Sequence, residues 1–340
     1  MTSAPRTARA EGPKAQEAVT NTRLYRDGRL EREGFPAADI SEYLADRSVT
    51  VWLDLYRPGR DDLAVLSDEF GLQPMAVEAA LHNNQRPKLV RYRGGQFLNA
   101  SAARLDTDTG ELAISGVATF ITHQALITVR QDDGLDIGAV VQRWDQFPGV
   151  AKSGVGYLLY GLLGYITDNQ FEAVQGLDDC MEGVEDQLFE GAPRGPGLQR
   201  RSFQLRKSLV LLRRIVNPMS GMIAELMHRD LRVDDDLMPY YQDVYDQALR
   251  TADWTEGLRD LVSSIVETNL AIQGNRLNVI TKKVTGWAAI IAVPTLVTGF
   301  FGMNVPYPGF GDKAGLAASI AIMVLAGLVL YVIFKRKDWL

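Results

Sequence analysis

The chain has 340 residues, of which 46% are hydrophobic and 23% are charged, and its formal net charge is −6. This length allows one or two domains with a buried core. The acidic balance argues against nucleic acid as a partner, because binding phosphates requires clustered Lys and Arg. Cys180 is the only cysteine, which excludes both an intrachain disulfide and a metal site built from cysteines.

The N-terminal part predicts a small α/β domain over residues 21–150. It follows a disordered tail, residues 1–20, that lacks the apolar run of a signal peptide. Short apolar and alternating runs predict strands over 49–55, 96–105, 111–122 and 125–130. Helices are expected over 61–71 and 73–82. Residues 106–110 resemble the start of a calcium loop but lack its later acids, and are interpreted as a hairpin turn.

After residue 150 the pattern becomes helical. Residues 151–236 predict an antiparallel helix pair with a Gly/Pro turn at 191–197. Residues 237–283 predict a stalk helix that continues without a break into the next segment. Charged residues on the pair are interpreted as solvated charge between its two helices. The bases are Arg200, Arg201, Arg206, Lys207, Arg213 and Arg214, and the acids are Glu172, Asp178, Asp179, Glu182, Glu185 and Asp186.

Two segments near the C-terminus, 284–303 and 314–334, carry no charged side chain. Each is long enough to cross about 30 Å of hydrocarbon as a helix. Two buried core helices are the alternative, but a soluble core rarely needs two such adjacent runs. Lys282 and Lys283 precede the first segment, and the basic C-terminus 335–340 follows the second. The positive-inside rule therefore places both termini in the cytoplasm and the loop 304–313 outside the inner or plasma membrane.

These elements together predict a cytoplasmic α+β domain with long helices, joined by the stalk helix to a two-helix hairpin in the lipid bilayer. Small and uncharged polar residues recur at steps of three and four positions, from Asn278 on the stalk into the first apolar segment. They are Asn278, Thr281, Thr285, Ala288, Ala292, Thr295, Gly299 and Gly302. Two helices cannot enclose an aqueous path, so transport requires several copies with this row facing a pore. Close helix packing through small residues is the alternative.

The chain resembles the CorA family of magnesium transporters over roughly residues 45–340. The motif Gly302-Met303-Asn304 ends the first apolar segment, and the second one ends in Lys337-Asp338-Trp339-Leu340. The resemblance implies a funnel-shaped homopentamer, a channel and not an enzyme, with Mg²⁺ as the transported and regulatory ion and Co²⁺ and Ni²⁺ as further candidates. It also implies that Gly302, Met303 and Asn304 form the selectivity filter and that Asn278 and Thr295 face the pore.

In that family, carboxylates between neighbouring cytoplasmic domains bind intracellular Mg²⁺ and hold the pore closed. Asp243 matches the stalk acid of this regulatory site. The usual partner acid falls at Ala79, so either Glu78 substitutes for it or the sensor is weaker. The external loop lacks the Pro-Glu-Leu of many relatives, and Asp312 is the acid expected to attract cations there, offset by its neighbour Lys313.

Two other functions stay open. The zinc-transporting branch of the same superfamily, with or without proton coupling, has this architecture. Met303 favours Mg²⁺ over Zn²⁺, and none of His82, His123 and His228 lies in the apolar segments or their loop. A membrane-tethered enzyme or scaffold is the second alternative, but the sequence has no phosphate loop, no H-E-x-x-H and no convincing nucleophile motif.

Overall fold

The structure is a computed structural model of the chain. It describes residues 19–36, 39–82, 86–146, 151–189, 196–229, 233–303, 306, 308–309 and 311–339. The chain divides into two compact units, Met1–Val262 and Ser263–Leu340. The predicted tail lies outside the described residues except for positions 19 and 20. These two begin the first strand, so the tail was predicted two residues too long.

A seven-stranded sheet forms the centre of the N-terminal unit, with strand order β2-β1-β3-β7-β6-β5-β4. Strands β3 and β7 pair in parallel, and all the other pairs are antiparallel. The strands are β1 Val19–Arg26, β2 Arg29–Glu33, β3 Val49–Tyr56, β4 Lys88–Tyr92, β5 Gly95–Asp106, β6 Glu111–Ile121 and β7 Ala125–Arg130. The four predicted strands correspond to β3, β5, β6 and β7.

The interpretation of residues 106–110 as a hairpin turn is confirmed. Asp106 pairs with Glu111 at the end of the β5–β6 ladder. The Asp106 carboxylate accepts hydrogen bonds from the amides of Asp108 at 2.9 Å and Thr109 at 3.2 Å. These bonds hold the turn. They also lower the pKa of the Asp106 carboxyl, and the bond from the amide of Thr109 is the largest cause.

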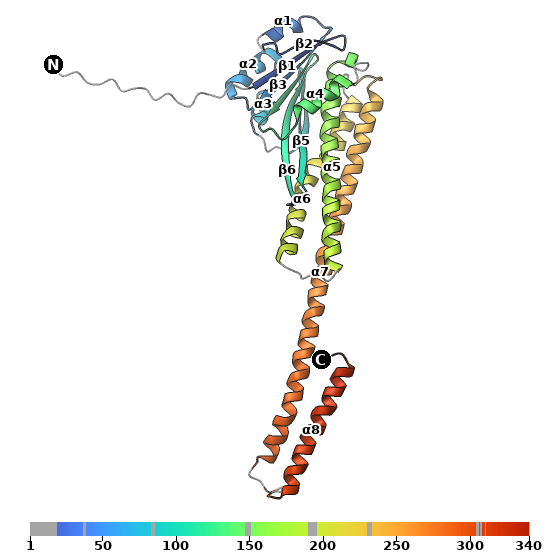
Figure 1. The fold of residues 1–340 in the computed structure, drawn as a ribbon. Coiled ribbons are helices and arrows are strands. Elements are labelled where there is room, and N and C mark those ends of the chain that lie inside the picture. Colours follow the sequence, from blue (N-terminus) through green and yellow to red (C-terminus); the bar gives the residue numbers. More distant parts are fainter. Residues whose placement is uncertain are drawn as a thin grey trace, which may run out of the picture. The chain divides into compact units, whose positions relative to one another are not determined.

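Helices cover both faces of the sheet (Figure 1). The short helices α1 Ile40–Leu44, α2 Arg60–Phe70 and α3 Pro74–Ala80 enclose one core cluster, which includes Leu53, Leu63 and Phe120. Helix α4 Ile137–Gln146, the 3-10 turn η2 Ala151–Ser153 and helix α5 Val155–Phe189 lie on the other face. There the rings of Trp52 and Trp144 meet edge to face at 4.9 Å, an arrangement worth about 0.5–1.5 kcal/mol beyond area burial.

Gly161 lets α5 approach the ring of Trp144. A Cβ at this position would lie 2.4 Å from both Cδ1 and Nε1 of the indole. Because Nε1 also donates a hydrogen bond to the carbonyl of Leu158 at 2.9 Å, the ring cannot move aside without losing that bond. We therefore expect Gly161→Ala to lower the free energy of unfolding by about 1–3 kcal/mol. Denaturant unfolding followed by tryptophan fluorescence measures this change.

Gly183→Ala is the matched control for that substitution, because Gly183 lies on the same helix and a Cβ added there would meet no atom within 4 Å. Alanine is the better helix former by about 0.8–1.0 kcal/mol, so this variant is expected to be neutral or stabilised. Equal destabilisation by the two substitutions would contradict the role assigned to close packing at Gly161.

The predicted helix pair is formed by α5 and by α6 Pro196–Arg229, which contact each other along the N-terminal unit. The prediction that their charged side chains face one another is wrong for Arg213. Its Nε lies 2.8 Å from Glu256 on α7. Arg201 donates to the carbonyl of Thr107 at 3.4 Å. Within the described ranges, no ion pair joins the predicted bases of α6 to the predicted acids of α5.

Helix α7, Met238–Phe301, contains both the predicted stalk and the first apolar segment, and α8, Lys313–Arg336, contains the second. The first apolar segment ends as a helix at residue 301, two positions earlier than predicted, and the second extends one to two residues further at each end. Pro294 lies inside α7 without ending it. The division at Val262 falls within α7, so the arrangement of stalks in a funnel stays a prediction.

Candidate ion pathway

Two described helices are long and apolar enough to cross a membrane, α7 and α8. Only 11% of the most apolar stretch of α7, and 6% of that of α8, is buried within the chain. The exposed fractions reach 75% for Leu296, 65% for Ile291 and 69% for Leu325. Leaving such side chains in water costs about 25 cal/mol for each Å² of apolar surface. Lipid or further subunits must therefore cover them.

The polar row of α7 lies uncovered. All of its eight residues, which are Asn278, Thr281, Thr285, Ala288, Ala292, Thr295, Gly299 and Gly302, are exposed. The buried residues in this part of α7 are Gly286 and Val297. Gly286 and Val297 are eleven positions, or about three turns, apart, so they lie on one side of the helix. Ala288 and Gly299 each follow one of them by two positions, which places them about 200° around the helix, on the opposite side. The row therefore faces away from the side that its own chain covers.

Threonine hydroxyls add acceptor oxygens on this row, at Thr295, and beside it, at Thr298. Thr295 donates its hydroxyl proton to the carbonyl of Ile291 at 3.1 Å, and Thr298 donates to Pro294 at 2.9 Å and to Thr295 at 3.0 Å. Because each proton is used within the helix, the oxygen lone pairs stay available to water or to a hydrated ion. Pro294 has no amide proton, so the carbonyl one turn earlier loses its usual donor.

The predicted filter begins where α7 ends. The amide of Gly302 donates to the carbonyl of Thr298 at 2.8 Å, and the amide of Met303 donates to Phe300 at 3.3 Å. A Cβ on Gly302 would lie 2.8 Å from the same Thr298 oxygen, which is why glycine suits this turn. Met303 is 46% exposed. Asn304, the third filter residue, lies outside the described residues.

Asp312 begins α8 with its carboxylate exposed. Its backbone carbonyl accepts the amides of Gly315 at 3.1 Å and Leu316 at 3.3 Å, but its side chain makes no capping hydrogen bond. The Asp312 carboxylate is therefore not hydrogen-bonded to the amides at the start of α8. Lys313, also exposed, stands next to it, as the sequence requires. The role of Asp312 in attracting cations stays a prediction.

The two acids of the predicted regulatory site do not form a metal site within one chain. Tyr241 is buried and donates to the carbonyl of Gly156 at 2.9 Å, which fixes the start of α7 and leaves Asp243 exposed. Glu78 accepts a hydrogen bond from Arg60 at 2.8 Å and lies 3.4 Å from His82. Among the described residues, no group of three or more His, Cys, Asp or Glu side chains is placed to hold a metal ion.

Ala79, the position of the usual partner acid, is only 7% exposed and belongs to the core cluster beneath α3. A carboxylate could not replace its methyl group without leaving that apolar contact. The neighbouring Glu78 is exposed but already paired with Arg60. Any metal that binds Glu78 must therefore compete with a guanidinium group.

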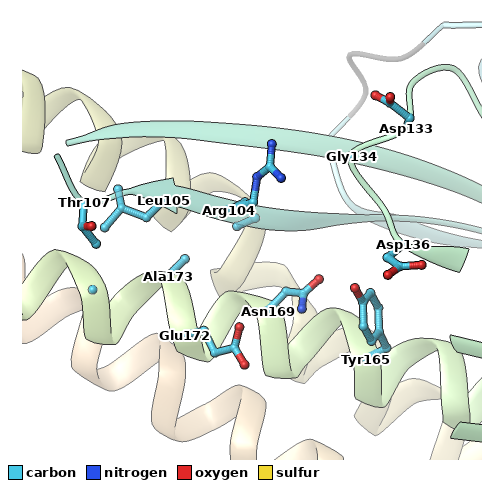
Figure 2. A pocket seen from close by; sticks show the side chains of 12 residues that line it. Arg104, Leu105, Thr107, Asp133, Gly134, Asp136, Tyr165, Asn169, Glu172 and Ala173 are labelled. Carbon is cyan, nitrogen blue, oxygen red and sulfur yellow. The ribbon is translucent and has the colours of Figure 1, made fainter. Parts of the chain in front are cut away.

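A pocket of about 350 Å³ lies between the end of β5, the loop after β7 and helix α5 (Figure 2). Arg104 comes from β5, Asp133 and Asp136 from the loop, and Tyr165 and Glu172 from α5. Burial raises the pKa of the Tyr165 hydroxyl. The lining mixes both signs of charge, and sequence reasoning did not single it out, since its residues come from three separate segments.

A sheet domain with long helices and two exposed apolar helices, the first with an uncovered polar row, fits a membrane protein. The family described as "CorA-like Mg2+ transporter protein" matches residues 47–336. The chain belongs to this family of divalent-cation transporters. Because members of the family are ion transporters, the prediction that the chain is not an enzyme is confirmed.

The chain is 29% identical over 313 residues to the cobalt/magnesium transport protein CorA of Thermotoga maritima, covering 90% of this chain and 88% of the relative. It is 27% identical over 282 residues to the zinc transport protein ZntB of Photorhabdus laumondii, covering 79% and 82%. The complete structure of the CorA magnesium transporter from Methanocaldococcus jannaschii matches with a TM-score of 0.75 at 22% identity, over 95% of this chain and 99% of that one. The last likeness shows a shared fold.

Proposed function

We propose that the chain is one subunit of a homopentameric channel in the cell membrane, with both termini in the cytoplasm. It admits Mg²⁺, and also Co²⁺ or Ni²⁺, down the inward-negative membrane potential. The observation that carries the proposal is the uncovered polar row on α7. Several copies placed around an axis would turn these rows inward, while the apolar remainder of each helix faces lipid or the other helices.

The chemistry of the row and filter suits a hydrated divalent ion. Mg²⁺ releases its water reluctantly and usually keeps several waters when it is bound. Neutral oxygens, such as the amide of Asn304 and the hydroxyl of Thr295, can hold those waters without stripping them. Neutral ligands also bind weakly enough for the ion to leave, which conduction requires.

Regulation by intracellular Mg²⁺ is proposed at Asp243 of one subunit and Glu78 of its neighbour. Asp243 is exposed near the start of α7, the helix that also carries the polar row, so a metal bound there could restrain the pore. The ion pair of Glu78 with Arg60 competes with the metal. We therefore expect this sensor to respond only to higher Mg²⁺ concentrations than one built from two unpaired acids.

The proposal is tested by Mg²⁺ uptake into proteoliposomes that contain a magnesium-sensitive dye. At an inside-negative potential, the wild type is expected to take up Mg²⁺. Asn304→Ala is expected to take it up at least about tenfold more slowly, which corresponds to a barrier higher by roughly 1.4 kcal/mol. Ser319→Ala is the control, because Ser319 lies on α8, outside the row. Native mass spectrometry should find five copies.

Zinc transport is the second candidate, favoured by the likeness to ZntB over most of both chains. The same vesicles are tested with Zn²⁺ and a proton gradient. Uptake of Zn²⁺ that follows the proton gradient, without Mg²⁺ uptake, would replace the proposal with this one. Vesicles that take up neither ion would contradict transport of both.

A further inference from the structure

A second pocket, of about 420 Å³, lies in the N-terminal unit between α6, α7 and the residues that lead into β4. Four arginine residues line it, which are Arg86, Arg213, Arg214 and Arg259. We call this site the arginine pocket. Three separate segments of the chain bring the four groups together, so the concentration of charge is a product of the fold.

Only two of the four arginines of the pocket form ion pairs among the described residues. Glu256 lies between two of the arginines, with an oxygen 2.8 Å from Nε of Arg213 and the other 2.7 Å from Nη1 of Arg259. Arg259 also contacts Asp260 at 3.1 Å. Arg86 and Arg214 have no acidic partner within the part of the chain that the structure describes. Among the described residues, the ion pairs thus leave two of the four arginines without an acid within 4 Å, in a chain whose net charge is −6.

Arg86 and Arg214 are both exposed, so a dissolved anion can reach them. At low ionic strength their charges attract such an anion, because salt screens them little there. The guanidinium group suits a phosphate in particular, because its fork of donors matches two oxygens at once. Two unpaired guanidinium groups therefore favour a ligand with two phosphate groups over a single small monovalent anion.

Apart from Asn217, the rest of the lining is apolar. Val210, Arg214 and Pro218 are spaced four residues apart and so follow one face of α6. Leu209 is buried, whereas Val210 is 46% exposed. The pocket thus pairs a charged part with an apolar part, and its volume falls within the range of about 300–1,000 Å³ that small-molecule sites occupy.

We propose that the arginine pocket binds a nucleoside polyphosphate. Arg86 and Arg214 hold its phosphates, and Val210 and Pro218 pack against its base. Glu256 acts as an internal competitor, because a phosphate that reaches Arg213 or Arg259 must displace this carboxylate. The inference does not depend on transport of Mg²⁺, since it rests on residues of the N-terminal unit alone.

Binding is tested by isothermal titration of the full-length protein in detergent with ATP at low ionic strength. We expect saturable binding whose Kd rises at least about tenfold in the double variant Arg86→Ala/Arg214→Ala, since two charge-assisted bonds are lost. Arg93→Ala, at an exposed arginine in the turn after β4, should leave the Kd unchanged. Glu256→Gln should tighten binding by about tenfold, because it removes the competing charge. If the pocket had only a structural role, Glu256→Gln would not lower the Kd of ATP.

Parallel titrations with pyrophosphate and with anionic lipid vesicles distinguish the sources of phosphate. Pyrophosphate binding as tight as that of ATP would overturn the assignment of a nucleoside, and preferential binding of the vesicles would overturn that of a soluble ligand. Absence of saturable ATP binding at millimolar concentrations, or a double variant with an unchanged Kd, would overturn the proposal. So would a double variant that loses subunits in native mass spectrometry, since acidic side chains of a neighbouring copy would then be the natural occupant.

Discussion

Replacing Asp54 by alanine is expected to lower the free energy of unfolding of the N-terminal unit by about 3–5 kcal/mol. Asp54 lies on β3, in the interior of the sheet, and its side chain is fully buried. Its carboxylate accepts hydrogen bonds from Arg130 at 2.6 and 3.0 Å and from the hydroxyl of Thr128 at 2.8 Å. Burial lowers the pKa of Arg130, but bonding to Asp54 more than offsets it, and the net shift is upward.

The cost arises because Asp54→Ala leaves a guanidinium group buried without its counter-charge. Urea unfolding followed by the fluorescence of the buried Trp52 and Trp144 measures the change. Asp54→Leu combined with Arg130→Met should cost less than the single substitution, since both charges are then absent. Glu31→Ala, which breaks the exposed pair with Arg26, should change stability little. A cost for Asp54→Ala no larger than that for Glu31→Ala would contradict the argument.

Periodicity predicted the central strands and the long helices, and failed at the edges of the sheet. Strand β2 is exposed at every residue, so no apolar alternation marks it. Strand β1 contains Arg23, which reads as a surface residue in the sequence. In the structure it is 5% exposed, because Glu33 and Asp145 pair with it. Long-range partners of this kind cannot be identified from local pattern.

The exposed face of the polar row could be predicted from the sequence, whereas its role as a pathway and the regulatory site stay predictions. The polar row follows from spacing along one helix, whose faces are known once the helix is assigned. The proposed regulatory site joins residues of different copies, so neither the sequence nor one chain displays it. The arginine pocket was missed for a related reason: Arg213 was predicted to face α5, but its partner Glu256 lies 43 positions away on α7.

Substituting Gly302 by alanine is expected to slow Mg²⁺ uptake by about five- to 150-fold, because overpacking of about 1–3 kcal/mol would displace the proposed filter and each 1.4 kcal/mol is tenfold. The added Cβ would lie 2.8 Å from the carbonyl oxygen of Thr298. That oxygen also accepts the amide of Gly302 at 2.8 Å, so the turn must open to accommodate the methyl group. Opening it moves Met303 and Asn304, which follow directly.

The dye-loaded proteoliposomes measure the rate, and Gly327→Ala is the matched control. Gly327 lies on α8, outside the polar row, with nothing within 4 Å of an added Cβ, so its substitution should leave uptake unchanged. Native mass spectrometry separates a blocked pore from failed assembly, since the Gly302 variant should keep its subunits. Uptake at the wild-type rate by an assembled Gly302→Ala protein would show that the turn after α7 does not position the filter, and the pathway would have to be sought elsewhere on the helix.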